Sequence, residues 1–106
     1  MKRYAIIGFC LFIFSCKKST PVDCSTVAYS STIKPLISSK CATSGCHSGN
    51  SSIGNFTNYD NVYAYYKSGR LKSAVVTTKS MPPNNSLSST ERKQIECWIN
   101  NGAINN

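Results

Sequence analysis

The chain has 106 residues and a formal net charge of +8, from twelve Lys or Arg and four Asp or Glu. This length supports one small domain and is marginal for a large apolar core. The basic residues form no dense run and no stripe with aromatic residues, so we expect no nucleic-acid partner. A basic surface favours partner proteins with acidic docking surfaces.

The N-terminal segment predicts export. Lys2 and Arg3 precede an apolar stretch from Tyr4 to Phe14, which is too short to span a bilayer and is typical of a secretory signal. The run Ile13-Phe14-Ser15-Cys16 resembles a bacterial lipobox, in which cleavage occurs just before a lipidated cysteine. We therefore expect residues 1–15 to be a lipoprotein-type signal peptide. Cys16 would anchor the chain to a bacterial membrane, on the side that faces the periplasm or the cell exterior.

Residues 16–29 are polar and predict a flexible tether, followed by a domain over residues 30–106. The first helix of this domain is expected after Thr32, which can serve as its N-cap. Ile33, Leu36 and Ile37 follow helical spacing, and Pro35 lies in the first turn, where its missing N–H costs little.

This helix leads into the run Cys41-Ala42-Thr43-Ser44-Gly45-Cys46-His47. A cysteine followed directly by histidine, with a second cysteine upstream, is the attachment motif of c-type haem. Both thiols add to the haem vinyl groups, and the imidazole binds the iron. The spacing is C-x4-C-H, a less frequent variant of the usual two-residue spacer, and Gly45 favours a bulge that accommodates the extra residues.

The middle of the chain predicts a loop, two helices and a turn. Residues 48–58 are rich in Gly, Ser and Asn and are expected to form a loop, whose Thr57 or Asn58 caps a helix over residues 59–66 that ends near Gly69. Residues 70–75 predict a second short helix. The run from Lys79 to Asn85 contains two prolines and two asparagines, which favours a turn.

The last helix has the clearest pattern. Ser88 and Glu91 fit a capping box, Ile95 and Trp98 lie on one helical face, and Gly102 can occupy the C′ position. No segment alternates as a β-strand would. We therefore expect a small all-α domain with long loops.

The six cysteines divide by role. Cys10 lies in the signal, Cys16 takes the lipid, and Cys41 and Cys46 take the haem. Cys24 and Cys97 remain and predict a disulfide, because an exported chain folds in an oxidising compartment. Closing so long a loop would stabilise the fold by roughly 4 kcal/mol.

His47 and Met81 are the candidate axial ligands of the haem iron. His47 is the only histidine, and Met81 is the only methionine apart from Met1. Met81 lies on a proline-stiffened loop, where a thioether can face a cavity, and His/Met ligation suits electron transfer. Aromatic residues that are candidates to line the haem pocket are Phe56, Tyr59, Tyr63, Tyr66 and Trp98.

These motifs resemble a monohaem class I c-type cytochrome in a small bacterial lipoprotein form. The resemblance spans about residues 32–104 and is carried by I-K-P-L-I before C-A-T-S-G-C-H, by S-G-R-L, by M-P-P and by the last helix, L-S-S-T-E-R-K-Q-I-E-C-W-I-N-N-G-A. It implies a cytochrome c-like helical domain around one covalent haem c. It also implies a one-electron carrier that can serve as a subunit of an oxidoreductase complex.

Three alternatives remain open from the sequence. The chain could be a haem-free exported lipoprotein, with Cys41 and Cys46 forming a disulfide, that acts as a binding or structural module. It could hold zinc through Cys41, Cys46, His47 and Cys97, although a second cysteine pair is missing. A haem-based ligand sensor is the third. Independent catalysis is not expected, because one histidine and four carboxylates form no recognisable acid–base constellation.

Overall fold

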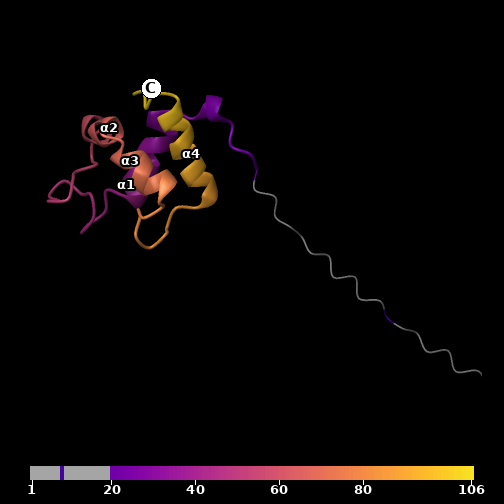
Figure 1. Cartoon of the computed structure of the whole chain (residues 1–106), viewed down its shortest axis with the longest axis horizontal. Coiled ribbons are helices and arrows are strands. Elements are labelled where there is room, and N and C mark those ends of the chain that lie inside the picture. Colours follow the sequence, from indigo (N-terminus) through magenta and orange to yellow (C-terminus); the bar gives the residue numbers. More distant parts are fainter. Residues whose placement is uncertain (1–7, 9–19) are drawn as a thin grey trace, which may run out of the picture.

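The computed structural model describes residue 8 and residues 20–106. The predicted signal peptide, Cys10, Cys16 and the first part of the tether lie outside the described residues, apart from Gly8. The described chain contains helices, turns and loops without a β-strand, so the prediction of a helical domain is confirmed at this level (Figure 1). No helix in this part of the chain has the length and hydropathy needed to cross a membrane.

Four α-helices form the domain. Their bounds are α1 Lys34–Lys40, α2 Tyr59–Lys67, α3 Arg70–Lys72 and α4 Ser89–Asn100. Short turns extend them: a 3-10 turn over Cys24–Thr26, and π-helical turns over Tyr29–Ile33 before α1 and Ser73–Thr77 after α3. Helix α4 contacts both π-helical turns, so the last helix packs against the first and the middle parts of the domain (Figure 1).

The start of α1 differs from the prediction. Thr32 does not cap the helix, because it lies inside the preceding π-helical turn, and α1 begins two residues later. The backbone N–H groups of Thr32 and Ile33 both donate to the carbonyl oxygen of Ala28. Since these donors are already satisfied by backbone, no side-chain cap is needed.

The caps predicted for α2 and α4 are confirmed. Asn58 Oδ1 accepts a hydrogen bond from the N–H of Asn61 at 3.0 Å. Ser88 and Glu91 form the capping box, with Glu91 Oε2 accepting from the N–H of Ser88 at 2.8 Å. Gly102 follows the C-cap of α4 in the left-handed region, with φ of +92°. Local sequence therefore determines where these two helices begin and where α4 ends.

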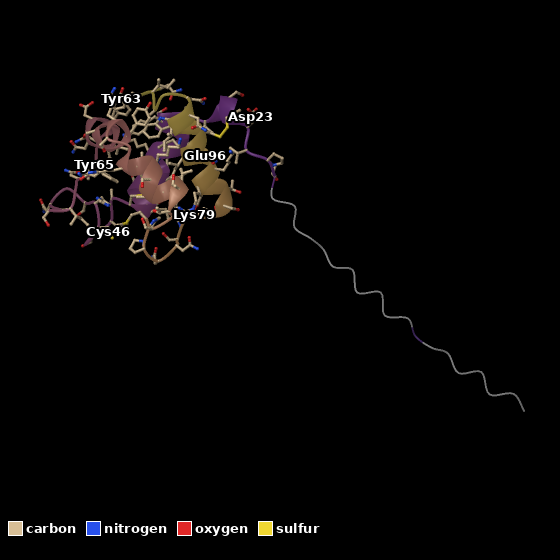
Figure 2. The ribbon with its side chains drawn as sticks, viewed as in Figure 1. Asp23, Cys46, Tyr63, Tyr65, Lys79 and Glu96 are labelled. Carbon is tan, nitrogen blue, oxygen red and sulfur yellow. A yellow bond between two sulfur atoms is a disulfide. The ribbon has the colours of Figure 1, made fainter. Side chains whose placement is uncertain are left out.

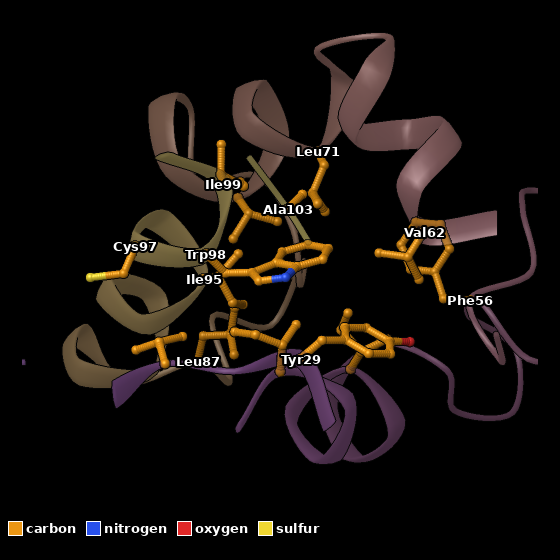
Figure 3. Close-up of a cluster of buried hydrophobic side chains, with 14 residues drawn as sticks. Tyr29, Phe56, Val62, Leu71, Leu87, Ile95, Cys97, Trp98, Ile99 and Ala103 are labelled. Atoms are coloured by element: carbon orange, nitrogen blue, oxygen red, sulfur yellow. The ribbon is translucent and has the colours of Figure 1, made fainter. Parts of the chain in front are cut away.

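The core centres on Trp98, which is 1% exposed and lies among side chains from every helix (Figure 3). Its Nε1–H donates to the carbonyl oxygen of Ile104 at 2.9 Å. An aromatic cluster continues from it and joins α2 to the π-helical turn Tyr29–Ile33; its members are Tyr29, Tyr59, Tyr63, Tyr66 and Trp98. This cluster holds the C-terminal segment in place, because the Tyr59 hydroxyl donates to the carbonyl oxygen of Ala103 at 2.8 Å.

The predicted Cys24–Cys97 disulfide is present, and it appears as the yellow bond near Asp23 in Figure 2. Residues 24–29, which the sequence assigned to the tether, pack onto the domain, and Val27 and Tyr29 are buried. The N–H groups of Tyr29 and Ser30 donate to the side chain and the backbone of the C-terminal residue. Both ends of the described domain are therefore fastened on the side where α4 ends.

Candidate cofactor cavity

One cavity of about 420 Å³ is lined by the four residues that the sequence marked for haem attachment and iron ligation. Cys41, Cys46, His47 and Met81 all line it. The apolar part of its wall comes from Ile37, Ile53, Phe56, Tyr65, Leu71, Ala74, Val75, Pro82, Pro83 and Ile95. Lys40 and Arg70 also line it. The volume lies within the range of roughly 300–1,000 Å³ that is usual for ligand and cofactor pockets.

The loop over residues 41–47 is folded by its own backbone. The N–H of Cys41 donates to the carbonyl oxygen of Ile37 at 2.9 Å, which continues α1 by one bond, and the N–H of His47 donates to the carbonyl oxygen of Cys41 at 3.0 Å. Gly45 occupies the left-handed region with φ of +79°, where a side chain would be strained. The four-residue spacer therefore forms a closed turn that brings Cys41, Cys46 and His47 to one cavity.

Cys41 and Cys46 are free thiols, so the disulfide of the haem-free alternative is not formed. Burial, with a smaller contribution from Cys46, raises the pKa of Cys41 to about 11. The thiol of Cys41 is therefore protonated at neutral pH. Both sulfur atoms are available for covalent bonds to another molecule.

The imidazole of His47 is held by two contacts. Its Nδ1–H donates to the carbonyl oxygen of Gly54 at 3.0 Å, because a carbonyl oxygen can only accept. Its ring is stacked on Phe56, with centroids 4.0 Å apart and 7° between the planes. This arrangement leaves Nε2 as the unprotonated nitrogen of the neutral ring, the form in which histidine binds a metal.

Met81 lies on the loop between the π-helical turn Ser73–Thr77 and α4; it lines the cavity, and 40% of its surface is exposed. Its N–H donates to the carbonyl oxygen of Ala74 at 3.0 Å. Its own carbonyl oxygen accepts a hydrogen bond from Arg92 Nη1 at 3.3 Å. The backbone of Met81 is therefore fixed on both sides while its thioether lies at the cavity.

The predicted pocket aromatics divide into two groups. Phe56 lines the cavity, whereas Tyr59, Tyr63, Tyr66 and Trp98 belong to the aromatic cluster and are not among the lining residues. Figure 2 shows Tyr63 and Cys46 at different ends of the domain. On α2, residues 59, 63 and 66 share one helical face, and that face is turned towards Trp98 and the C-terminal segment.

Sequence reasoning missed Tyr65, Gly54 and Arg92. The Tyr65 ring lies edge-on to Phe56, at 4.9 Å, and its hydroxyl donates to the carbonyl oxygen of Ile53 at 3.3 Å. One signal could have identified Arg92: it lies three residues before Ile95 and shares the apolar stripe of α4, where a solvated cation does not belong. Gly54 and Tyr65 carry no comparable signal, because loop contacts define their roles.

The expectation of a metal-binding, iron-holding chain has to be corrected for a site built from protein side chains alone. Across the described residues, no three His, Cys, Asp or Glu side chains gather closely enough to hold a metal ion. The zinc alternative fails in addition because Cys97 is bonded to Cys24. The polypeptide alone therefore offers no metal-ion centre.

The chain was compared with protein-family models, with curated proteins and with solved structures, and none of them matches it. The residues and the geometry of the cavity are therefore the basis for assigning a function.

Proposed function

We propose that this chain is a one-electron carrier that binds one haem c covalently through Cys41 and Cys46, with His47 and Met81 as axial ligands. One observation carries the proposal: the run of residues 41–47 and the separate loop that carries Met81 bring these four residues to the same apolar cavity. On this proposal the helical domain is a cytochrome c-like fold around the haem.

The residues of the cavity fit such a group. A haem brings its own four ring nitrogens to the iron, so the protein has to supply only axial donors, and a cluster of three or more metal-binding side chains is not required. The cavity offers two free thiols, an imidazole with Nε2 available, and a thioether. Apolar residues make up most of the remaining wall, as a macrocycle of this kind requires.

A haem held by His47 and Met81 would supply one-electron chemistry, and the thioether would raise its reduction potential. The chain's own residues hold the donors in place and restrict water, which the apolar side chains of Leu71 and Val75 help to exclude. None of the four carboxylates, Asp23, Asp60, Glu91 and Glu96, lines the cavity. With His47 assigned to the iron on this proposal, the cavity holds no carboxylate that could pair with it in acid–base chemistry, which supports a carrier rather than an enzyme.

The residues that line the cavity also support the proposal that the redox partners have acidic docking surfaces. Lys40 and Arg70 line the cavity, and Ile53 and Met81 are exposed there, with 57% and 40% of their surfaces accessible. Cationic groups beside apolar contacts steer association with an acidic surface, and salt should slow it. No nucleic-acid partner is proposed.

We further propose that Cys16 anchors the carrier by lipid to a bacterial membrane on the exported side. Replacing it, Cys16→Ser, should release the domain from the membrane fraction and leave its visible spectrum unchanged. A variant that stays in the membrane fraction would argue against lipid at Cys16.

Covalent haem is tested by expressing the full chain in a host that matures c-type cytochromes. Intact mass should increase by one haem, and haem staining should survive denaturation. Cys46→Ala should lose covalent haem, because its thiol is adjacent to His47. The double change Cys24→Ser, Cys97→Ser removes two cysteines that do not line the cavity and should retain covalent haem. Folded wild-type protein of unmodified mass from such a host would refute the proposal.

A haem-based ligand sensor is the second candidate, favoured by the partial exposure of Met81. A weakly held sixth ligand would let carbon monoxide bind to the reduced protein, whereas a carrier should resist it.

A further inference from the structure

The guanidinium of Arg92 is the one buried charged group of the described chain, since only 8% of the residue is exposed. Arg92 lies in the first turn of α4. The only ion pair among the described residues joins Lys93 to Glu96, so no carboxylate neutralises Arg92. A charge that is buried without an ion partner needs several good hydrogen bonds to offset its desolvation.

All three acceptors of Arg92 belong to the segment that carries Met81. Nη1 donates to the carbonyl oxygen of Val75, in the turn before the loop, and to that of Met81, at 3.3 Å. Nη2 donates to Asn85 Oδ1 at 3.0 Å, near the end of the loop. A planar guanidinium fork can bind three oxygens at once, which an ammonium on a flexible stem does less well.

The loop needs such a restraint because its backbone is strained on both sides of Met81. Lys79 and Asn85 both adopt the left-handed region, with φ of +55° and +53°. Neither is glycine, and such positions persist only where surrounding contacts enforce them. The hydrogen bonds from Arg92 reach the turn before this loop, Met81 within it and Asn85 at its end.

We propose that Arg92 is a positioning residue that clamps the loop over residues 79–85 to α4 and so sets the location of the Met81 thioether at the cavity. The inference rests on the proposed function for its consequence, since Met81 has a ligand role only if haem is bound. The clamp itself is a property of the chain.

Two matched pairs of variants test the clamp in the purified full chain. Arg92→Gln removes the fork and is compared with Lys93→Gln, which removes an exposed charge from the next position of α4. Asn85→Gly removes one acceptor and relieves its own backbone strain. Its control is Asn84→Gly, which introduces the same flexibility at the neighbouring position without affecting an Arg92 acceptor.

The first readout is hydrogen exchange at the Met81 amide, which is independent of haem chemistry. Exchange should become about tenfold faster in Arg92→Gln and several-fold faster in Asn85→Gly, because hydrogen bonds to a charged donor are among the stronger ones. In both controls the exchange rate should change by less than twofold. Arg92→Lys should recover part of the protection. The second readout, on haem-loaded protein, is the sulfur-to-ferric-iron absorption band, which should weaken in the same order.

The outcomes separate the two proposals. Equal Met81 exchange in Asn85→Gly and Asn84→Gly would overturn the clamp, even if Arg92→Gln fails to fold. A wild-type chain that takes up no haem, while its Met81 amide still responds to Arg92→Gln, would refute the proposed function and leave the clamp standing. Haem-loaded Arg92→Gln with an undiminished sulfur band would show that the clamp does not position Met81.

Discussion

The ring of Phe56 lies flat against the imidazole of His47, with 4.0 Å between their centroids and 7° between their planes. The backbone reinforces the contact, because the N–H of Phe56 donates to the carbonyl oxygen of His47 at 2.9 Å. The stack fixes the plane of the imidazole, and the hydrogen bond from Nδ1 to Gly54 fixes its rotation. The loop after the cysteine–histidine motif therefore orients the only histidine of the chain.

Gly54→Ala should disrupt this orientation. A Cβ at this position would clash with the Tyr65 hydroxyl group, and φ is +120°, which an alanine rarely adopts. Overpacking and backbone strain together should lower the free energy of unfolding by about 2 kcal/mol. Chemical denaturation measures the change. Gly49→Ala in the same loop is the control, since its Cβ would meet nothing closer than 4.0 Å, and an equal loss in both variants would contradict the steric argument.

Removal of the disulfide should affect stability more than it affects the cavity. Cys24 and Cys97 are 73 residues apart, so the bridge restricts a long loop of the unfolded chain, and the double change to serine should cost roughly 4 kcal/mol of unfolding free energy. Urea denaturation of both forms gives the difference. Haem attachment at Cys41 and Cys46 should be retained, because neither Cys24 nor Cys97 lines the cavity. A loss below about 1 kcal/mol would show that the unfolded chain is already compact.

Local patterns in the sequence predicted the helices well. The caps at Asn58 and Ser88 were predictable because each depends on side chains within three residues. The start of α1 was not predictable, since Thr32 lies in a turn whose hydrogen-bond acceptor is the carbonyl oxygen of Ala28. Ala28 belongs to residues 16–29, which the sequence predicted to be a tether. Tertiary packing of residues 24–29 decided that boundary.

The site was predictable only where sequence spacing constrains it. Cys41, Cys46 and His47 are close in sequence, and Met81 was singled out by its proline-rich surroundings, so all four could be named in advance. The pocket aromatics could not be assigned from the sequence, because Tyr63 and Tyr65 are chemically equal and differ only in the helical face they occupy. That choice depends on where α2 packs, which no local pattern of α2 specifies.

Alkylation of Cys41 in the haem-free chain should depend steeply on pH. Because the thiolate is the reactive form and the pKa is raised to about 11, roughly one thiol in a thousand is ionised at pH 8. The rate with iodoacetamide should therefore increase about tenfold per pH unit up to pH 10. Peptide mass spectrometry follows the modification, and the chain unfolded in urea is the control, in which the rate should level off near the ordinary pKa of 9.0.

The raised pKa of Cys41 also makes the stability of the fold depend on pH. The folded chain retains the Cys41 proton more strongly than the unfolded chain, so this contribution to stability is complete below pH 9.0 and is lost as the pH rises to about 11. A rate of Cys41 alkylation that already levels off at pH 9 in the folded chain would contradict the burial of its thiol.

Met81→Ala should change the haem-loaded protein more than any other substitution outside the attachment motif. Removing the thioether should abolish the sulfur-to-ferric-iron band, open the iron to carbon monoxide or imidazole, and lower the reduction potential, because a thioether stabilises the ferrous form. Met81→His should restore six-coordination and keep the potential low, since imidazole is the stronger donor. Ser80→Ala, at the preceding position, is the control and should retain the band. A wild-type protein that lacks the band and binds carbon monoxide readily when reduced would exclude Met81 as the ligand and favour ligand sensing over electron transfer.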